Sequence, residues 1–283
     1  MTFSPSKSNR KVDLRLPFRR LNSLLNEFLQ DLVKEDWSRP TIHSNRNVKD
    51  LVAHLLAGTL QRLSRQRDGF PFSKKVEPLA FQELVELIQG SNVEWINAMK
   101  RLSPRLLIEL IQKYDNELLD FFDGIDLDAE APFGVAWAGE DVSANWFDIA
   151  REYTEKWHHQ QQLRDATNHP PLYDRDLFLP TLQTFALGFP FALQKVRAQE
   201  GDSVSVNVSG IIEESWSLQY KSAGWVLLDI PMKTSATSLT IDSDAAWRIW
   251  TKGVQKEQIV SKVIINGNHS FSEAILNYVA IMA

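Results

Sequence analysis

The sequence predicts an α+β protein in which a helical bundle precedes a small α+β domain. Apolar residues recur with the helical period of 3.6 through the first part of the chain, and period-two alternation, typical of strands, begins only after Pro171. Hydrophobic residues at 43% and charged residues at 24% of the 283 residues are ordinary for a globular protein. We therefore place a domain boundary near residues 168–174, with residues 1–170 as an up-and-down four-helix bundle and residues 171–283 as a small second domain.

The first domain is expected to be helical after a loose lead-in over residues 1–12. Apolar stripes predict helices over residues 14–34, 45–67, 81–102, 105–122 and 143–168, with His43 in a short loop before the second. Residues 68–71 end the second helix, residues 90–92 either interrupt or continue the third, and residues 123–140 form a loop. Ser103 and Pro104 are typical of an N-cap and a first-turn proline, and Ser143 is expected to cap the last helix.

The second domain mixes short strands with helices. Alternating segments predict strands over residues 203–208, 216–220, 225–228, 238–241 and 259–265, with a hairpin turn at 221–224. Helices are expected over residues 177–199, 243–252 and 271–281. Asp242 begins a stretch like a calcium loop, but Ala246 and Trp247 stand where that loop needs a ligand and a glycine, so a helix cap is the simpler role.

Composition excludes several classes of function. The net charge of −5 does not suit a nucleic-acid surface, so we expect no nucleic-acid partner. The absence of cysteine excludes disulfides, thiolate metal ligands and a cysteine nucleophile, so that any thiol must come with a small-molecule cofactor. We see no apolar run near the roughly 20 residues that span a bilayer. The polar N-terminus is not that of a secretory signal, so we expect a cytoplasmic protein without a membrane partner.

The candidate site combines a helical Glu-x-x-x-His pair with a distant histidine. Glu155 and His159 share one helix face because they stand four residues apart, and His54 lies alone in an apolar helical stretch. Two imidazoles and a carboxylate suit a divalent metal with open positions, and zinc, nickel and iron all accept such ligands. His158, three residues after Glu155, is a rival ligand to His159.

Simpler roles exist for each of these residues. His54 could be a core histidine bonded to a carbonyl, and Glu155 with His159 could be a surface ion pair worth a few tenths of a kcal/mol. Against the surface pair, Tyr153 and Trp157 flank Glu155 and indicate a helix packed on both sides, where a carboxylate needs a metal or a cation.

The pattern resembles the mycothiol-dependent maleylpyruvate isomerase-like proteins, which belong to the DinB-type superfamily of metal-binding four-helix bundles. The resemblance covers roughly residues 14–168 and depends on Trp37, residues 48–55, Glu155 with His159, and Arg164-x-Ala166. Residues 242–283 are similar to the sterol-carrier-like α/β domain of these isomerases.

The resemblance implies a divalent metal, usually zinc, held by His54, Glu155 and His159. It also implies a low-molecular-weight thiol such as mycothiol, whose pKa the metal lowers. In the isomerases the thiolate adds to an activated double bond, rotation follows and elimination returns the trans isomer, whereas relatives transfer the thiol to another electrophile.

The chain departs from the family at Gln162, where many members have aspartate. An amide should neither balance charge nor orient a ligand as a carboxylate does, which bears on the maleylpyruvate substrate more than on the metal. A basic residue of the second domain is expected to face the site, and Arg248 and Lys252 are the candidates, with surface exposure as the alternative.

Two hypotheses follow. The first is a metal-dependent isomerase or thiol S-transferase. The alternative is a non-catalytic metal- and ligand-binding protein with a vestigial site. The sequence leaves open which metal, thiol and substrate are used, and the oligomeric state.

Overall fold

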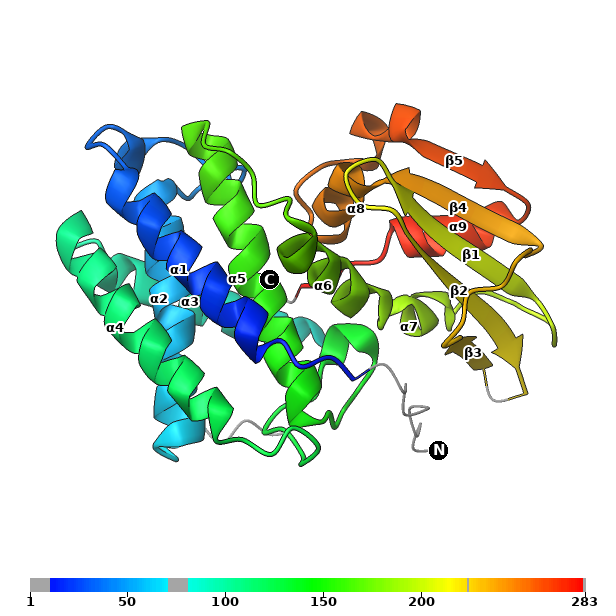
Figure 1. Cartoon of the computed structure of the whole chain (residues 1–283), viewed down its shortest axis with the longest axis horizontal. Helices are drawn as coiled ribbons and strands as arrows, with labels where there is room; N and C mark the ends of the chain where they lie inside the picture. The colour runs from blue at the N-terminus through cyan, green and yellow to red at the C-terminus, as the bar shows by residue number, and fades with distance from the viewer. Residues whose placement is uncertain (1–10, 71–80, 223, 282–283) are drawn as a thin grey trace. The chain divides into compact units, whose positions relative to one another are not determined.

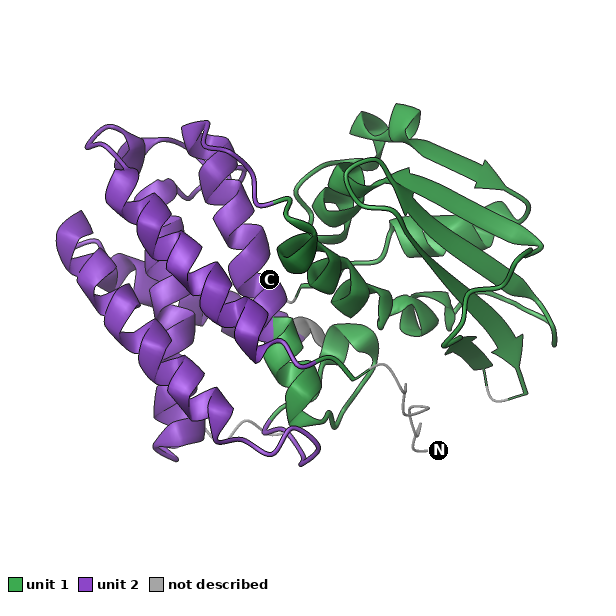
Figure 2. Cartoon of the chain, viewed as in Figure 1, with its two compact units in different colours: residues 1–12, 133–151, 173–281 green, residues 13–132, 152–172, 282–283 purple. Residues whose placement is uncertain are grey.

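The computed structural model describes residues 11–70, 81–222 and 224–281 (Figure 1) and confirms the predicted fold class. The described chain divides into two compact units, one containing residues 13–132 and 152–172 and the other residues 133–151 and 173–281 (Figure 2). The first unit is helical and the second contains a five-stranded sheet. The boundary near residues 168–174 stays a prediction.

The helical unit is built from long helices. Their bounds are α1 Arg15–Asp31, α2 Val48–Arg62, α3 Phe81–Met99, α4 Pro104–Asp123 and α5 Asn145–Thr167, the last beginning in the other unit. A 3-10 turn, Asp36–Ser38, follows α1, and a π-helical stretch, Leu63–Arg67, continues α2. Within the bundle α4 packs against α1 and α2, and α2 also packs against α3.

Side-chain caps fix where α2 and α4 begin. Asn47 and Asp50 form a reciprocal capping box at the start of α2. Ser103 caps α4 as predicted, because its side chain accepts a hydrogen bond from the backbone N–H of Leu106. The start of α2 matters most for the site, since it sets which face of the helix carries His54.

The structure decides one open point of the helical prediction and corrects another. Helix α3 continues through residues 90–92 without a break. Ser143 does not cap α5, because α5 begins at Asn145 and the Ser143 hydroxyl accepts from the Val135 N–H and donates to Glu140. Ser143 thus closes the preceding loop.

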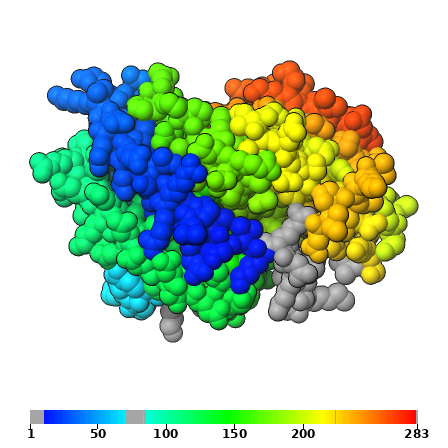
Figure 3. All heavy atoms as spheres, viewed as in Figure 1, coloured from blue at the N-terminus to red at the C-terminus, as the bar shows by residue number. Residues whose placement is uncertain are grey.

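The core of the bundle draws on all five helices, and aromatic rings from α1, α4 and α5 meet within the bundle. The fully buried Phe18 ring contacts those of Phe122 and Tyr153, with centroids 6.0 and 5.7 Å away. Lys156 and Asp115 form an ion pair at 2.8 Å with both side chains almost completely buried. The space-filling view shows α1 along the surface of the bundle (Figure 3), and Leu16 on its outer face is 79% exposed.

The sheet of the second unit has the strand order β3-β2-β1-β4-β5. Strands β1 and β4 pair in parallel and the other neighbours are antiparallel. The strand bounds are β1 Ser203–Ser209, β2 Glu214–Lys221, β3 Gly224–Leu227, β4 Thr237–Asp242 and β5 Val263–Asn266. Strand β5 begins four residues later than predicted, because two 3-10 turns occupy Lys256–Gln258 and Val260–Lys262. The predicted hairpin turn includes residue 223, which lies outside the described residues.

The helices of this unit are shorter than predicted. Their bounds are α6 Arg175–Ala186, α7 Phe189–Leu193, α8 Ser243–Trp250 and α9 His269–Leu276. The single helix predicted over residues 177–199 is two helices separated at Gly188, whose backbone lies so close to the Tyr278 ring that a Cβ would stand 1.9 Å from its hydroxyl oxygen. Asp242 caps α8 by accepting from the Ala245 N–H, as expected from the sequence.

One stretch of this unit, Arg175–Leu193, is long and apolar enough to span a membrane by length and composition alone. Its mean hydropathy is 1.2, and 56% of the window is buried within the protein. The core helix of a globular protein passes the same test, so this segment is weak evidence for a membrane span.

Candidate metal centre

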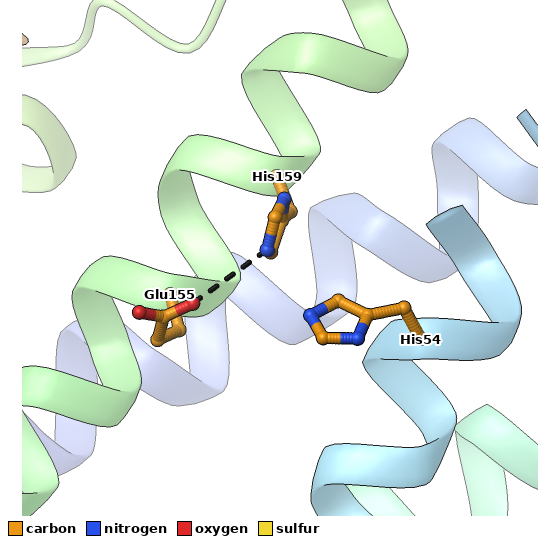
Figure 4. Close-up of side chains that lie close together, drawn as sticks. All are labelled: His54, Glu155 and His159. Carbon is orange, nitrogen blue, oxygen red and sulfur yellow. Dashed lines mark ion pairs between the residues drawn. The ribbon is translucent and has the colours of Figure 1, made fainter. Parts of the chain in front are cut away.

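Helices α2 and α5 bring His54, Glu155 and His159 together, although 101 positions of sequence separate the first two (Figure 4). One ligand atom from each residue lies within 4.8 Å of the other two. His159 Nε2 is 3.6 Å from Glu155 Oε2, and the His54 and His159 rings are nearly perpendicular with centroids 4.9 Å apart. The helical spacing of Glu155 and His159 places both side chains on the face of α5 that meets α2.

His54 lacks the hydrogen bond that a structural core histidine would make. Its Nδ1 atom is buried and has no hydrogen-bond partner among the described residues. Its neighbours Ala53 and Leu55 are buried in the core of the bundle. Burial lowers the pKa of His54 well below its usual value, so the imidazole is neutral and retains a lone pair for a metal.

Glu155 is ionised in spite of its surroundings. Burial alone would raise the pKa of its carboxyl, but the imidazoles of His158 and His159 outweigh that effect and hold the pKa at about 2. Its side chain is 26% exposed and that of His159 is 6% exposed, so the pair is not a solvated surface contact. The carboxylate of Glu155 supplies the negative charge of the three-residue cluster.

Gln162 orients His159, contrary to the expectation that an amide could not. Its Oε1 atom accepts from Nδ1 of His159 at 2.8 Å and from Nε2 of His43 at 3.1 Å. Because an amide oxygen only accepts hydrogen bonds, the proton of His159 is fixed on Nδ1 and Nε2 is left facing Glu155. A hydrogen bond from the remote ring nitrogen is the usual way in which a ligating histidine is positioned.

His158 has a structural role instead of joining the cluster. Its Nδ1 donates to the Thr154 carbonyl at 2.8 Å, and its side chain is buried beside the His159 ring. Burial lowers the pKa of His158 to about 3. Between the two rival ligands, the geometry therefore favours His159.

The sequence reasoning missed His43 and the role of Gln162. His43 lies in the loop before α2, and burial together with the charge of His159 lowers its pKa to about 4. The available signal was a histidine a short distance ahead of the helix that carries His54, but its contact with Gln162 spans 119 positions of sequence.

Arg248 and Lys252, the predicted basic residues of the second domain, lie in the unit that contains the sheet. Arg248 Nε pairs with Asp244 Oδ1 at 2.9 Å, and its guanidinium lies over the Trp247 ring at 4.4 Å. Lys252 follows α8 with a positive φ of 58° and its side chain is exposed. Asp244 also accepts from the Tyr173 hydroxyl, so Arg248 is part of a polar cluster.

Comparison with known proteins finds a matching family model. The family described as "Mycothiol maleylpyruvate isomerase N-terminal domain" matches residues 18–164, more than half of the chain. No curated protein matches the sequence.

Two solved structures share the fold. A crystal structure of the mycothiol-dependent maleylpyruvate isomerase matches with a TM-score of 0.55, and a mutant form of it with 0.53. Each is 12% identical and covers 89% of this chain and 91% of the other chain. At this identity the likeness concerns the fold, and it extends over both units.

Proposed function

The chain belongs to the mycothiol maleylpyruvate isomerase N-terminal domain family, and we propose that it is a metal-dependent enzyme that uses a low-molecular-weight thiol. The reaction is either cis-trans isomerisation of a small unsaturated electrophile, as in maleylpyruvate isomerase, or transfer of the thiol to such an electrophile. The thiol is mycothiol or one like it, the metal is zinc, and the protein is cytoplasmic.

The observation that carries the proposal is the convergence of His54, Glu155 and His159 within 4.8 Å. Their donor set of two nitrogens and one oxygen fits zinc and leaves positions for exogenous ligands. The unpartnered Nδ1 of His54 and the single tautomer of His159 support a ligand role over a purely structural one.

His54, Glu155 and His159 would hold a divalent ion, which would lower the pKa of a thiol so that a thiolate would be present near neutral pH. The chain has no cysteine of its own, so the thiol must come from solution. In an isomerisation the thiolate forms a C–S bond to the activated double bond and the π electrons move to the conjugated carbonyl oxygen. Rotation about the resulting single bond and elimination of the thiolate restore the double bond in the trans form.

The protein's own residues supply orientation. Gln162 holds the His159 ring through a hydrogen bond to Nδ1. Arg248 and Lys252 are proposed as the basic residues of the second domain that act on the substrate.

The first test is metal content. The purified protein should hold near-stoichiometric zinc by elemental analysis, and His54→Ala, Glu155→Ala and His159→Ala should each lose it while circular dichroism shows an intact bundle. His158→Gln is the matched control, because it removes a neighbouring histidine outside the cluster and should retain zinc. A protein that takes up no metal on reconstitution, or a His158→Gln variant that alone loses it, would exclude the three-ligand site.

A turnover assay distinguishes an active enzyme from a protein whose metal site has lost its catalytic function. With zinc bound, the protein should convert a cis-configured unsaturated dicarboxylic substrate, or conjugate an electrophile, only when thiol is added. Bound zinc with no thiol-dependent turnover would instead support the non-catalytic metal- and ligand-binding alternative.

A further inference from the structure

We propose that Gly58 and Glu152 form a binding subsite for the thiol, in which a hydrogen-bond donor of the thiol meets the Glu152 carboxylate one helical turn from the metal centre. That the ligand is the thiol rests on the proposed function, whereas the subsite itself rests on the geometry of α2 and α5. Both residues belong to the helical unit.

Gly58 lies on the same accessible face of α2 as His54. Of residues 51–59 only these two are partly exposed, and the other seven are buried. Their spacing of four residues places them on one face of the helix, one turn apart. A ligand that reaches His54 along this face of α2 therefore passes over Gly58.

Packing within the protein does not explain a glycine at this position. Glycine is a poor residue for the interior of a helix, and Gly58 has no positive φ that would require it. Outside α2 itself, the nearest atom to a Cβ placed there would be Oε1 of Glu152 at 3.9 Å, which is an ordinary van der Waals contact. Alanine would fit and strengthen the helix, so a ligand that lies over Gly58 is the better explanation for the missing side chain.

Glu152 offers a polar group to the same face. It and Glu155 are the partly exposed positions among residues 152–164 of α5, and their spacing of three residues puts them on one side of the helix. Oε2 of Glu152 accepts from Arg62 Nε at 2.7 Å, and this ion pair holds the carboxylate in place, because the two side chains are only 13% and 8% exposed. Oε1 is left on the Gly58 side, without a hydrogen bond from the described residues.

The chemistry of Oε1 defines what the ligand must carry. A carboxylate oxygen only accepts hydrogen bonds, so the matching group is a donor such as an amide N–H, an ammonium or a hydroxyl. Glu152 and Glu155 are about 4.5 Å apart along the axis of α5. A thiol with its sulfur at the metal centre therefore meets Oε1 with a donor a short chain away, and thiols without such a donor lose this contact.

The test compares N-acetylcysteamine, whose amide N–H is two carbon atoms from the sulfur, with its ester analogue 2-mercaptoethyl acetate, which lacks that donor. Isothermal titration calorimetry measures the binding of each to the protein as purified. We expect the unmodified protein to bind the amide about tenfold to a hundredfold more tightly, the range for a hydrogen bond to a charged group. In Glu152→Gln the amide oxygen takes over the bond from Arg62 and an NH2 group replaces Oε1, so the preference should disappear while zinc is retained.

Gly58→Ala tests the subsite without disturbing the ion pair, so it serves even if Glu152→Gln fails to fold. Its methyl group should weaken the binding of N-acetylcysteamine by about fivefold or more, while the better helix former raises Tm by about 1–3 °C and the zinc content is unchanged. Gly90→Ala is the matched control, because Gly90 is an exposed glycine within α3 with no atom within 4 Å of a Cβ placed there. It should raise Tm similarly and leave thiol binding unchanged.

Several outcomes would overturn the proposal: equal affinity of the unmodified protein for the two thiols, binding of neither, an amide preference that survives in Glu152→Gln, or unchanged binding in Gly58→Ala. Zinc content and thiol-dependent turnover are measured separately. A protein that turns over substrate but binds both thiols alike would refute the subsite alone. One that prefers the amide but shows no turnover would refute the proposed function alone.

Discussion

Replacing Gln162 with leucine should weaken metal binding at a site that the substitution does not touch directly. The amide oxygen is the acceptor for His159 at 2.8 Å and for His43 at 3.1 Å, while the amide nitrogen already lacks a partner. Leucine is similar in size, so the change removes one acceptor and leaves two imidazole N–H donors without it. We expect Gln162→Leu to lower zinc affinity by about 10- to 100-fold, the usual cost of losing an outer-shell partner.

The structure also predicts how far Gln162→Leu lowers the free energy of unfolding. An unsatisfied buried donor costs about 1–3 kcal/mol, and His43 is exposed enough to recover part of that cost through water. The free energy of unfolding of the metal-free protein should therefore fall by roughly 2–4 kcal/mol. Competition with a chelator measures the zinc affinity, and denaturant unfolding measures the stability.

Gln161→Leu is a closely matched control. Gln161 is equally buried on the same helix, its oxygen accepts from the Leu172 N–H at 2.9 Å, and its nitrogen also has no partner. This variant should lose about 1–3 kcal/mol of stability but keep its zinc affinity. Gln162→Glu keeps an acceptor for both imidazoles and should bind zinc at least as tightly as the unmodified protein. The reasoning is refuted if Gln162→Leu retains zinc affinity within a factor of about two, or if Gln161→Leu loses as much.

Two further predictions concern buried ionisable groups of α5. Lys156→Met leaves Asp115 buried without its cation and should destabilise the protein by about 3–5 kcal/mol in denaturant unfolding. The double variant Lys156→Met with Asp115→Leu should regain much of that stability, because no buried charge is left unpaired. Equal stability of the single and double variants would contradict this prediction. His158 has a native pKa of about 3 against 6.5 for an ordinary histidine, so on acidification the unfolded chain binds its proton first. Stability of the metal-free protein should therefore be unaffected by this group above pH 7 and fall by about 1.4 kcal/mol per pH unit below its unfolded pKa. His158→Gln, which keeps a donor for the Thr154 carbonyl, should reduce that slope in unfolding curves recorded from pH 7.5 to 5.

Local physics was sufficient to predict where the helices of the bundle lie. The period of the apolar residues and the caps depend on neighbours a few positions away, so α2 and α4 begin close to where the sequence places them. Errors arose where a distant residue decides the outcome. At the break between α6 and α7, Gly188 lies against Tyr278, ninety positions away, and no local pattern contains that contact, although Pro190 in the first turn of α7 is a local signal for the break.

The same difference between local patterns and contacts of distant residues applies to the candidate site. The spacing of Glu155 and His159 shows that they share a helix face, and an isolated histidine among leucines directs attention to His54. The role of Gln162 could not be inferred in this way, because the loop that brings His43 to it is positioned by tertiary structure. From the sequence, Gln162 is interpreted as a replacement that removes the orienting carboxylate of the family. In the structure its amide oxygen still accepts the hydrogen bond from His159 Nδ1 that orients the ring.

Helix α5 explains why a polar sequence can lie at the centre of the bundle. A helix with polar residues on every side is usually expected at the surface. Here a run of polar side chains is buried, comprising Lys156, His158, His159, Gln160, Gln161, Gln162 and Arg164. Most of these make structural bonds to other elements: Lys156 to α4, Gln160 to the Leu21 carbonyl of α1, and Gln161 to the segment after the helix.

These bonds, with those of Arg164 to the Leu24 and Pro170 carbonyls, account for the run except for His158, His159 and Gln162. His158 donates within α5 to the Thr154 carbonyl, and the hydrogen bonds of His159 and Gln162 lead to one another and to His43. Burying that group is costly and contributes little to holding the helices together. Of this group, His159 lies within 4.8 Å of His54 and Glu155. A divalent metal bound by these three residues, with Gln162 orienting His159, would account for the arrangement, and on this ground we propose that the cluster is functional.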